Sequence, residues 1–377
     1  MSNASKDQGS KPAIMITGAA GFIGTALRKS LNSEYDLVCV DLLPAPSKNS
    51  GQSVEEWHQV DVTDIQAVDS LFRSLQKPLS GMIHLAWYYD FSNLPHPRYQ
   101  AAVDSVAALT EAFGLNAKPD APFLFASSMA AMAPTVPGVK QTPESPSSEA
   151  WQYPASKVRG EKALRFAAVD QPVVELVLAG VYSDFCELVP LYQSIERIRR
   201  GSIQSWFYPG RTDRGLTYVH VDDVTRAFRC ALHASYPKSR TVHRLLVGET
   251  SPVTNQKIFA SACTTFRRRQ VPILKVPPAL AKLGARVIGL VSKDNFVQPW
   301  MIEFAEEHFE FDLSRTEQVI GWTPIRNLLD TLPTMLSLAS HDTAEWLMRN
   351  ERRPWRRKGQ NMLSMVPSRS GPHRVNR

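Results

Sequence analysis

Short apolar runs alternate with segments of helical periodicity through the first half of this chain of 377 residues. Each run is long enough for a buried strand, and between the runs apolar residues recur at the spacing of an amphipathic helix. Strands that are linked through helices pair in parallel, and a parallel sheet is covered by helices on both faces. The pattern predicts an α/β fold built on a doubly wound parallel sheet. The expected strands lie at or within Ala13–Thr17, Asp36–Asp41, Trp57–Asp64, Gly81–Trp87, Phe123–Ser128 and Val173–Gly180, and the longer expected helices at Tyr99–Phe113 and Gln152–Ala168.

The heptapeptide GAAGFIG joins the first expected strand to the first expected helix. Glycine permits a tight turn and the close approach of a pyrophosphate, while the following helix offers free N–H groups and the positive end of its dipole. The spacing of Gly18, Gly21 and Gly24 is GxxGxxG, which differs from the commonest dinucleotide fingerprint, so a purely structural turn is the alternative. The position of the motif predicts a Rossmann-type dinucleotide-binding domain.

Asp41 stands at the end of the second expected strand. A carboxylate there accepts hydrogen bonds from the adenosine ribose of NAD and repels the 2′-phosphate of NADP. The alternative role is that of a turn or helix-capping residue. Lys48 lies in a Pro/Ser-rich segment that could fold back to pair such a phosphate, whereas Arg28 is too far along its helix. We expect NAD as the cofactor, with NADP less favoured.

A second group of residues suggests acid–base chemistry. Tyr153 and Lys157 in YPASK lie four residues apart, on one face of a helix, and Ser128 ends the fifth expected strand at the ligand-binding edge of the sheet. A lysine ammonium and a positively charged nicotinamide would lower the pKa of the tyrosine from about 10. The tyrosine could then exchange a proton with a substrate oxygen to which Ser128 donates a hydrogen bond. The alternative is a surface pair and a strand-end cap.

Several segments together match a known pattern, namely TGAAGFIG, DVTD, HLAW, FASSM and YPASKVRGEKAL, with YVHVDDV and FDLSRTEQVIGWTP further on. Through them the chain resembles the extended short-chain dehydrogenase/reductases, also called the NAD-dependent epimerase/dehydratase family, over about residues 12–340. The resemblance implies hydride transfer at a carbonyl or hydroxyl carbon, with Ser128, Tyr153 and Lys157 as the catalytic triad. It also implies cofactor contacts from Gly18, Gly21, Phe22, Ile23, Gly24, Asp61, Val62, Leu85, Ala86 and Ser127, besides Asp41, Tyr153 and Lys157.

The chain departs from the nucleotide-sugar enzymes of that family at two positions. Gly180 stands where they typically carry an asparagine that helps bind the substrate diphosphate, and Leu216 stands where they tend to place an arginine. Arg211 and Arg214 are the candidates to replace that arginine, and Trp87 after HLA also indicates an altered pocket. We expect an NAD(P)-dependent oxidoreductase; the alternative is a nucleotide-sugar epimerase or dehydratase with internal redox.

Four regions follow from these assignments. Residues 1–11 are expected to be a disordered tail, 12–180 the NAD-binding Rossmann domain, 181–348 mainly a smaller substrate-binding region, and 349–377 a basic, disordered tail. Much of the net charge of +7 lies in that last segment, whose alternative role is an arm for an anionic partner, and we expect no nucleic-acid binding. Residues 277–292 predict an amphipathic helix that packs on the substrate region, with a lid or a membrane-surface helix as the alternative.

The remaining composition indicates an ordinary soluble globular protein. The four cysteines form neither a CxxC pair nor a Cys/His cluster, which predicts no disulfide framework and no metal site. No apolar leader or transmembrane run occurs in the sequence given, so we expect a cytoplasmic protein that acts on a small molecule, with a homodimer as the candidate assembly. The opposing class of function is a non-catalytic dinucleotide-binding sensor or scaffold. The triad favours an enzyme, because a sensor has no need for all three residues.

Overall fold

The structure, a computed structural model, describes residues 11–46, 55–91, 93–167, 169–237, 241–267, 273–291 and 299–351. Residues 1–10 and 352–377, which make up most of the two predicted tails, lie outside this part of the chain, as does Lys48. The last described helix, α11 (Thr343–Glu351), extends past the predicted boundary at residue 348. Asn350 is buried in it, so the folded body includes the first residues that were assigned to the tail.

In the described part of the chain, seven strands form a parallel central sheet in the order β11-β6-β5-β4-β1-β2-β3. The order runs outward in both directions from β1 and β4, and ligands of open α/β sheets bind at the carboxyl ends of strands at such a switch point. This is the predicted doubly wound sheet. The strands are β1 Ala13–Thr17, β2 Asp36–Asp41, β3 Glu56–Gln59, β4 Met82–His84, β5 Phe123–Ser128, β6 Val173–Leu178 and β11 Val242–Val247.

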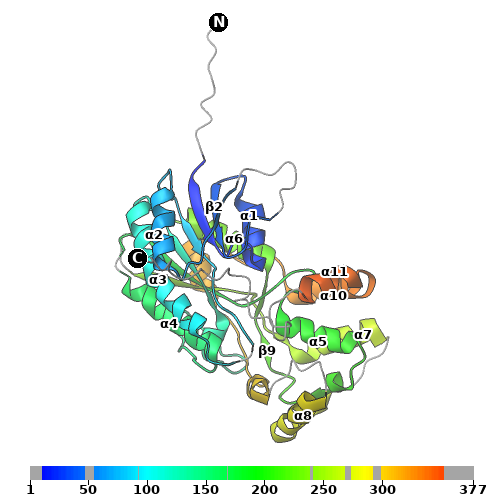
Figure 1. Ribbon diagram of the computed structural model, residues 1–377. Coiled ribbons are helices and arrows are strands. Elements are labelled where there is room, and N and C mark those ends of the chain that lie inside the picture. Colours follow the sequence, from blue (N-terminus) through cyan, green and yellow to red (C-terminus); the bar gives the residue numbers. More distant parts are fainter. Residues whose placement is uncertain are drawn as a thin grey trace, which may run out of the picture.

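Helices cover both faces of this sheet (Figure 1). Successive side chains of a strand point to opposite faces, so β1 contributes Ile14 and Ile16 to the core under α1 and α6, and Ala13 and Met15 to the core under α2, α3 and α4. A strand that is apolar at every position therefore requires two covered faces. The helices are α1 Phe22–Leu31, α2 Ile65–Ser74, α3 Pro97–Asn116, α4 Gln152–Phe166 and α6 Val221–His233.

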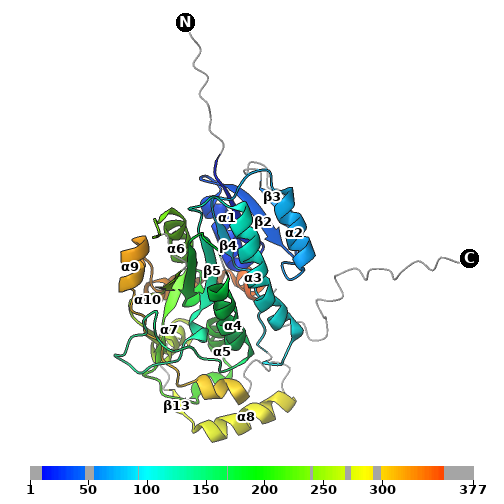
Figure 2. The same cartoon turned by 90° about the vertical axis from the view of Figure 1, so that its left-hand side faces the viewer.

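The C-terminal half adds a second body with its own hydrophobic core, formed by α5, α7, α10 and α11. The predicted domain boundary at residue 180 does not separate the two bodies completely. Helix α6 and strand β11 follow this residue in sequence but pack on or belong to the central sheet. Figure 2 shows α8 at the end of the molecule farthest from α2 and β3. The bounds in this half are β7 Gly180–Tyr182, α5 Val189–Arg199, β8 Phe207–Tyr208, β9 Gly215–Leu216, β10 Tyr218–His220, β12 Val253–Thr254, α7 Asn255–Arg267, β13 Leu274–Lys275, α8 Pro278–Val291, α9 Ser314–Ile320 and α10 Leu328–His341, with short 3₁₀ turns at η1 Met129–Ala131, η2 Ile203–Trp206 and η3 Pro299–Phe304.

The element predictions from the sequence differ from the structure mainly at their ends. The strands expected at Ala13–Thr17, Asp36–Asp41 and Phe123–Ser128 are confirmed at those bounds. The third strand ends at Gln59, within the segment WHQVDVTD, and Asp64 caps α2 by accepting hydrogen bonds from two backbone N–H groups, which confirms that this segment ends a strand and starts a helix. Among the described residues no helix combines the length and the apolarity that crossing a membrane requires.

Candidate active site

The glycine turn between β1 and α1 is sterically closed to larger residues. Gly18 has φ +71°, and a Cβ there would lie 2.9 Å from the backbone nitrogen of Ala86. A Cβ at Gly24 would overlap the carbonyl oxygen of Gly18. Helix α1 follows Gly21 with no side-chain cap and no carboxylate in its first turn. The turn thus presents bare backbone and a helix N-terminus at the switch point, which is the arrangement that binds a pyrophosphate.

Asp41 lies directly against this turn. Its Oδ2 accepts a hydrogen bond from Ala20 N at 2.9 Å, and its Oδ1 accepts one from Leu43 N at 3.0 Å. Each carboxylate oxygen keeps a second acceptor site for a ribose hydroxyl. Arg28 is engaged elsewhere, since it pairs with Glu55 at 2.8 Å. Asp41 therefore occupies the position that was predicted for it, beside the glycine turn.

Two further cofactor segments reach the same edge of the sheet. Asp61 and Val62 follow β3, where the Asp61 carboxylate accepts hydrogen bonds from Thr63 N and Oγ1 at 3.0 and 2.7 Å. Leu85 and Ala86 follow β4 and donate their backbone N–H groups to the carbonyl and hydroxyl oxygens of Thr17. The predicted adenine-side and central cofactor residues are thus brought together with the glycine turn.

The structure also brings Ser128, Tyr153 and Lys157 together. Ser128 ends β5, and Tyr153 lies in the first turn of α4, close enough to the Ser128 side chain for that contact to lower the pKa of Tyr153. Lys157 follows one helical turn later; it is buried, and its Nζ donates to the Ala126 carbonyl at 2.8 Å. The three side chains therefore lie at the carboxyl end of β5, as their spacing predicted.

In the protein without a cofactor, burial raises the pKa of Tyr153 to about 12, and the contact with Ser128 opposes this rise. The lowered pKa expected from the sequence depended on a bound, positively charged nicotinamide as well as on Lys157, and it stays a prediction. The pKa rises because aromatic neighbours remove water from the phenol, while the lysine ammonium points to a backbone carbonyl. Burial also lowers the pKa of Lys157 to about 7, which the charges of Glu161 and Glu175 oppose. The protein alone does not supply a phenolate at neutral pH.

Trp87 has a defined place beside this triad. Its ring centroid lies 4.0 Å from Lys157 Nζ, and its Nε1 donates to Ser156 Oγ at 3.1 Å. A Cβ at Gly160 would lie 2.5 Å from the Trp87 ring, so the indole fills the space that this glycine leaves open. The sequence indicated an altered pocket at Trp87 but not this contact with the catalytic helix.

Two buried carboxylates behind the triad were missed from the sequence. Ser127, predicted to contact the nicotinamide side, donates its hydroxyl to Glu161. Glu175 in the middle of β6 pairs with Arg244 at 2.6 Å and with Arg165 at 3.0 Å. Glu161 follows Lys157 by four residues, which was a signal for its position, but only the sheet order brings Arg244 to Glu175. These pairs support the back of β5 and α4.

A cavity of about 1040 Å³ opens from the triad into the C-terminal half. Gly180 lines this cavity. A Cβ added to Gly180 would lie 3.0 Å from the Leu188 side chain and 3.1 Å from the Tyr218 ring, so a larger residue there requires these neighbours to move. Arg211 is exposed and pairs with Asp213 at 2.7 Å, and among the described residues neither it nor Arg214 lines the cavity. Of the predicted site residues, those that do line it are Phe22, Ile23, Leu85, Ser127, Ser128, Tyr153 and Lys157.

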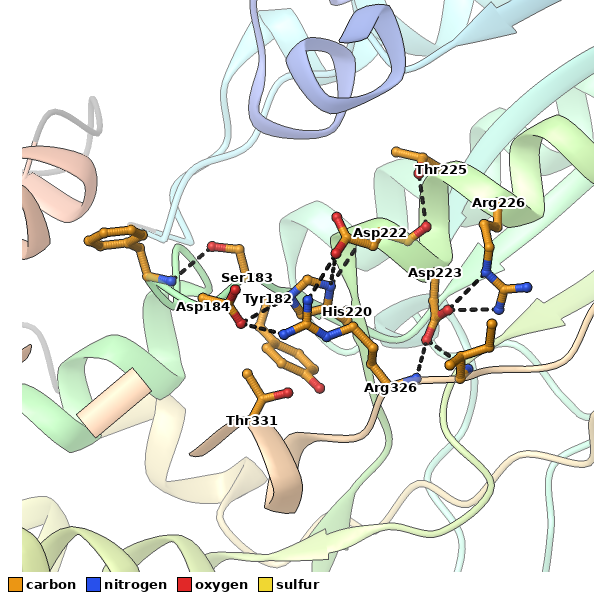
Figure 3. Close-up of polar contacts among 12 residues, drawn as sticks. Tyr182, Ser183, Asp184, His220, Asp222, Asp223, Thr225, Arg226, Arg326 and Thr331 are labelled. Carbon is orange, nitrogen blue, oxygen red and sulfur yellow. Dashed lines mark hydrogen bonds and ion pairs between the residues drawn. The ribbon is translucent and has the colours of Figure 1, made fainter. Parts of the chain in front are cut away.

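The segment YVHVDDV binds the residues that directly follow FDLSRTEQVIGWTP (Figure 3). The buried carboxylate of Asp223, from YVHVDDV, accepts the backbone N–H groups of Ile325 and Arg326 at 3.0 and 2.8 Å. The Arg326 guanidinium in turn contacts Asp222 at 2.9 Å and Asp184 at 2.5 Å. These contacts hold the chain that follows α9 against the start of α6. Their role is therefore structural.

The switch point, the bare glycine turn and the carboxylate beside it define a dinucleotide-binding protein of the Rossmann class. The model of the NAD dependent epimerase/dehydratase family matches residues 14–243 of the chain. The chain belongs to this family of NAD-dependent enzymes, as the resemblance predicted.

Solved structures with the same fold include several nucleotide-sugar enzymes. UDP-glucose 4-epimerase of Thermotoga maritima, solved with UDP-glucose, is 19% identical with a TM-score of 0.64, over 88% of this chain and 99% of that one. UDP-glucose 4-epimerase of Thermus thermophilus, solved with NAD, is 18% identical with a TM-score of 0.64, over 87% and 99%. WbmG of Bordetella bronchiseptica, solved with NAD and UDP, is 18% identical with a TM-score of 0.65, over 89% and 96%. No curated protein matches the chain.

Proposed function

We propose that the chain catalyses NAD-dependent hydride transfer at a carbonyl or hydroxyl carbon, with Tyr153 as the proton-transferring residue. The observation that carries this proposal is that Ser128, Tyr153 and the buried Lys157 line one cavity, which also reaches Phe22 and Ile23 of the glycine turn. Surface pairs and strand caps do not converge on a cavity in this way.

The site fits a dinucleotide, because side chains larger than glycine at Gly18 or Gly24 would fill the turn. NAD bound there would accept or donate the hydride. Tyr153 would take the proton of a substrate hydroxyl, or return it to a carbonyl oxygen, and Ser128 would hydrogen-bond that oxygen and hold it in reach. Lys157, when protonated, would stabilise the phenolate that forms.

Asp41 supports NAD rather than NADP as the cofactor. Both of its oxygens are already fixed by backbone N–H groups beside the glycine turn, so the carboxylate cannot swing away without losing two hydrogen bonds. A 2′-phosphate in that place would meet a fixed like charge. Lys48, the one basic residue weighed as a counter-charge, lies outside the described residues.

The second candidate function is epimerisation or dehydration of a nucleotide sugar with internal redox, which the similar structures solved with UDP-glucose or UDP favour. Gly180 and Leu216 disfavour this function, because they stand where nucleotide-sugar enzymes typically carry an asparagine and an arginine. Each of those two side chains would add a contact of about 1.5 to 3 kcal/mol to the substrate diphosphate. Net oxidoreduction is therefore the reaction that we propose.

The test is the state of the cofactor on purified protein, followed through the absorbance of reduced nicotinamide. Cofactor that exchanges freely, together with reduction of added NAD in the presence of a secondary alcohol, supports a dehydrogenase. Stoichiometric cofactor that survives purification, with conversion of UDP-glucose and no net change in absorbance, supports the second candidate. Protein that binds NAD and converts no member of a panel of alcohols, ketones and UDP-sugars is a sensor, and the proposal is then wrong.

A further inference from the structure

Four aromatic side chains form a connected cluster beside Tyr153. Tyr89 lies edge-on to Tyr153 with ring centroids 4.5 Å apart, and Trp151 lies 5.6 Å from it. Trp151 is stacked with Phe91 at 5.9 Å and lies 5.1 Å from Trp300. The four residues come from three segments far apart in the sequence, and all of them line the cavity. We call these four residues the aromatic wall.

The cavity beyond the aromatic wall continues with apolar or small side chains. Helix α8 contributes Ala281, Gly284 and Ala285, and a Cβ at Gly284 would meet no heavy atom within 4 Å. This helix was predicted to pack on the substrate region, with a lid or a membrane-surface helix as the alternative. Its Lys282 pairs with Glu303 of η3 at 2.8 Å, which holds the helix beside the cavity. The space at Gly284 leaves room for a bulky ligand.

The cavity is lined by charged side chains of both signs: Lys157, Arg197 and Arg200 are basic, and Glu187 and Glu307 are acidic. Glu187 and Glu307 both line the cavity, and burial raises the pKa of Glu307 to about 7. A diphosphate would add two negative charges beside these carboxyl groups. Arg197 of α5 and Arg200, the residue that caps the C-terminus of α5, line the cavity, and Arg200 contacts the buried carboxylate of Glu196 at 2.5 Å.

The geometry points to a substrate that is an uncharged, ring-bearing apolar ketone or secondary alcohol, whose ring stacks on the aromatic wall while its oxygen reaches Tyr153 and Ser128. This inference rests on the proposed function, which it narrows to a substrate class. Apolar and aromatic side chains bind flat ring systems through area burial and favourable ring geometry. In reduction, the carbonyl carbon would receive hydride from NADH, which becomes NAD, and the carbonyl oxygen would receive the Tyr153 proton, which solvent replaces.

The test uses calorimetry on NADH-loaded protein with 2-acetonaphthone and, separately, with UDP-glucose as probes. The ketone should bind at least about tenfold more tightly than UDP-glucose. Trp300→Ala should weaken the ketone by about 2- to 13-fold, which corresponds to one aromatic contact. Gly284→Leu introduces a better helix former and fills the open space, so it should abolish ketone binding and leave NADH affinity unchanged. Arg286→Leu, an exposed position on the same helix, is the matched control and should change neither.

The outcomes separate the two proposals. Protein that does not bind NADH refutes the proposed function itself. Protein that binds NADH and prefers UDP-glucose to the ketone refutes only the substrate class. Ketone binding that survives Gly284→Leu places the ketone outside this cavity and also overturns the inference, even if Trp300→Ala is too unstable to study.

Discussion

Replacing Gly160 with alanine tests how Trp87 packs against the helix that carries Tyr153 and Lys157. The new Cβ would lie 2.5 Å from Trp87 Cη2, about 1 Å inside an ordinary carbon–carbon contact, and 3.3 Å from two further ring atoms. The indole cannot move freely, because its Nε1 is bonded to Ser156 and its face covers Lys157. Overpacking of this kind costs about 1–3 kcal/mol.

The same substitution also improves helix propensity by about 1 kcal/mol, so the net loss in the free energy of unfolding should be about 0–2 kcal/mol. Gly284→Ala is the matched control, since it lies inside helix α8 with nothing within 4 Å and should gain up to about 1 kcal/mol. Urea unfolding of both variants measures the difference, which should be about 1–3 kcal/mol in favour of Gly284→Ala. A Gly160→Ala protein as stable as the control would show that Trp87 does not lie against α4.

Three further predictions concern other parts of the molecule. Asp41→Ala should weaken NAD and narrow or reverse its preference over NADP in calorimetric titrations; an unchanged preference would mean that Asp41 does not face the ribose. Asp223→Ala should lower the free energy of unfolding by about 1–3 kcal/mol, because the backbone N–H groups of Ile325 and Arg326 lose their acceptor, and an effect near zero would contradict Figure 3. Burial raises the pKa of Glu249 from 4.5 to about 7, so between these pH values the folded state binds a proton that the unfolded state has lost. The free energy of unfolding of the wild type therefore falls as the pH rises through this range. Glu249→Gln, compared with wild type by urea unfolding at several pH values, should therefore gain in relative stability from about pH 5 to pH 8, and a pH-independent difference would refute the shift.

Local sequence patterns were sufficient for the sheet and the cofactor turn. The apolar runs of β1, β2 and β5 are bounded by glycine, polar or charged residues, and the turn between β1 and α1 depends on glycines whose replacement the backbone excludes. Ser128, Tyr153 and Lys157 could be placed together because each stands at a strand end or on one helix face. For these features the local chain contains all of the necessary information.

The features that the sequence did not predict depend on contacts between distant segments. The aromatic wall joins residues after β4, at the start of α4 and in η3, and no periodic pattern connects them. The return of β11 to the sheet edge, and with it the Arg244–Glu175 pair, follows from sheet order rather than from local propensity. The raised pKa of Tyr153 follows from burial, which the spacing of the triad does not reveal.

The most direct test of the central claim uses the substrate identified in the panel of alcohols, ketones and UDP-sugars. The turnover of this substrate by the Tyr153→Phe variant is measured together with the affinity of the variant for NAD. The phenylalanine ring still packs against Tyr89 and Trp151, and only the proton-transferring hydroxyl is lost. Turnover should fall by about 100- to 10,000-fold while NAD affinity stays close to that of wild type. Tyr35→Phe, a buried tyrosine outside the described cavity lining, is the control and should keep normal turnover. A Tyr153→Phe enzyme that retains more than about a tenth of wild-type turnover would contradict the assignment of Tyr153 as the acid–base residue.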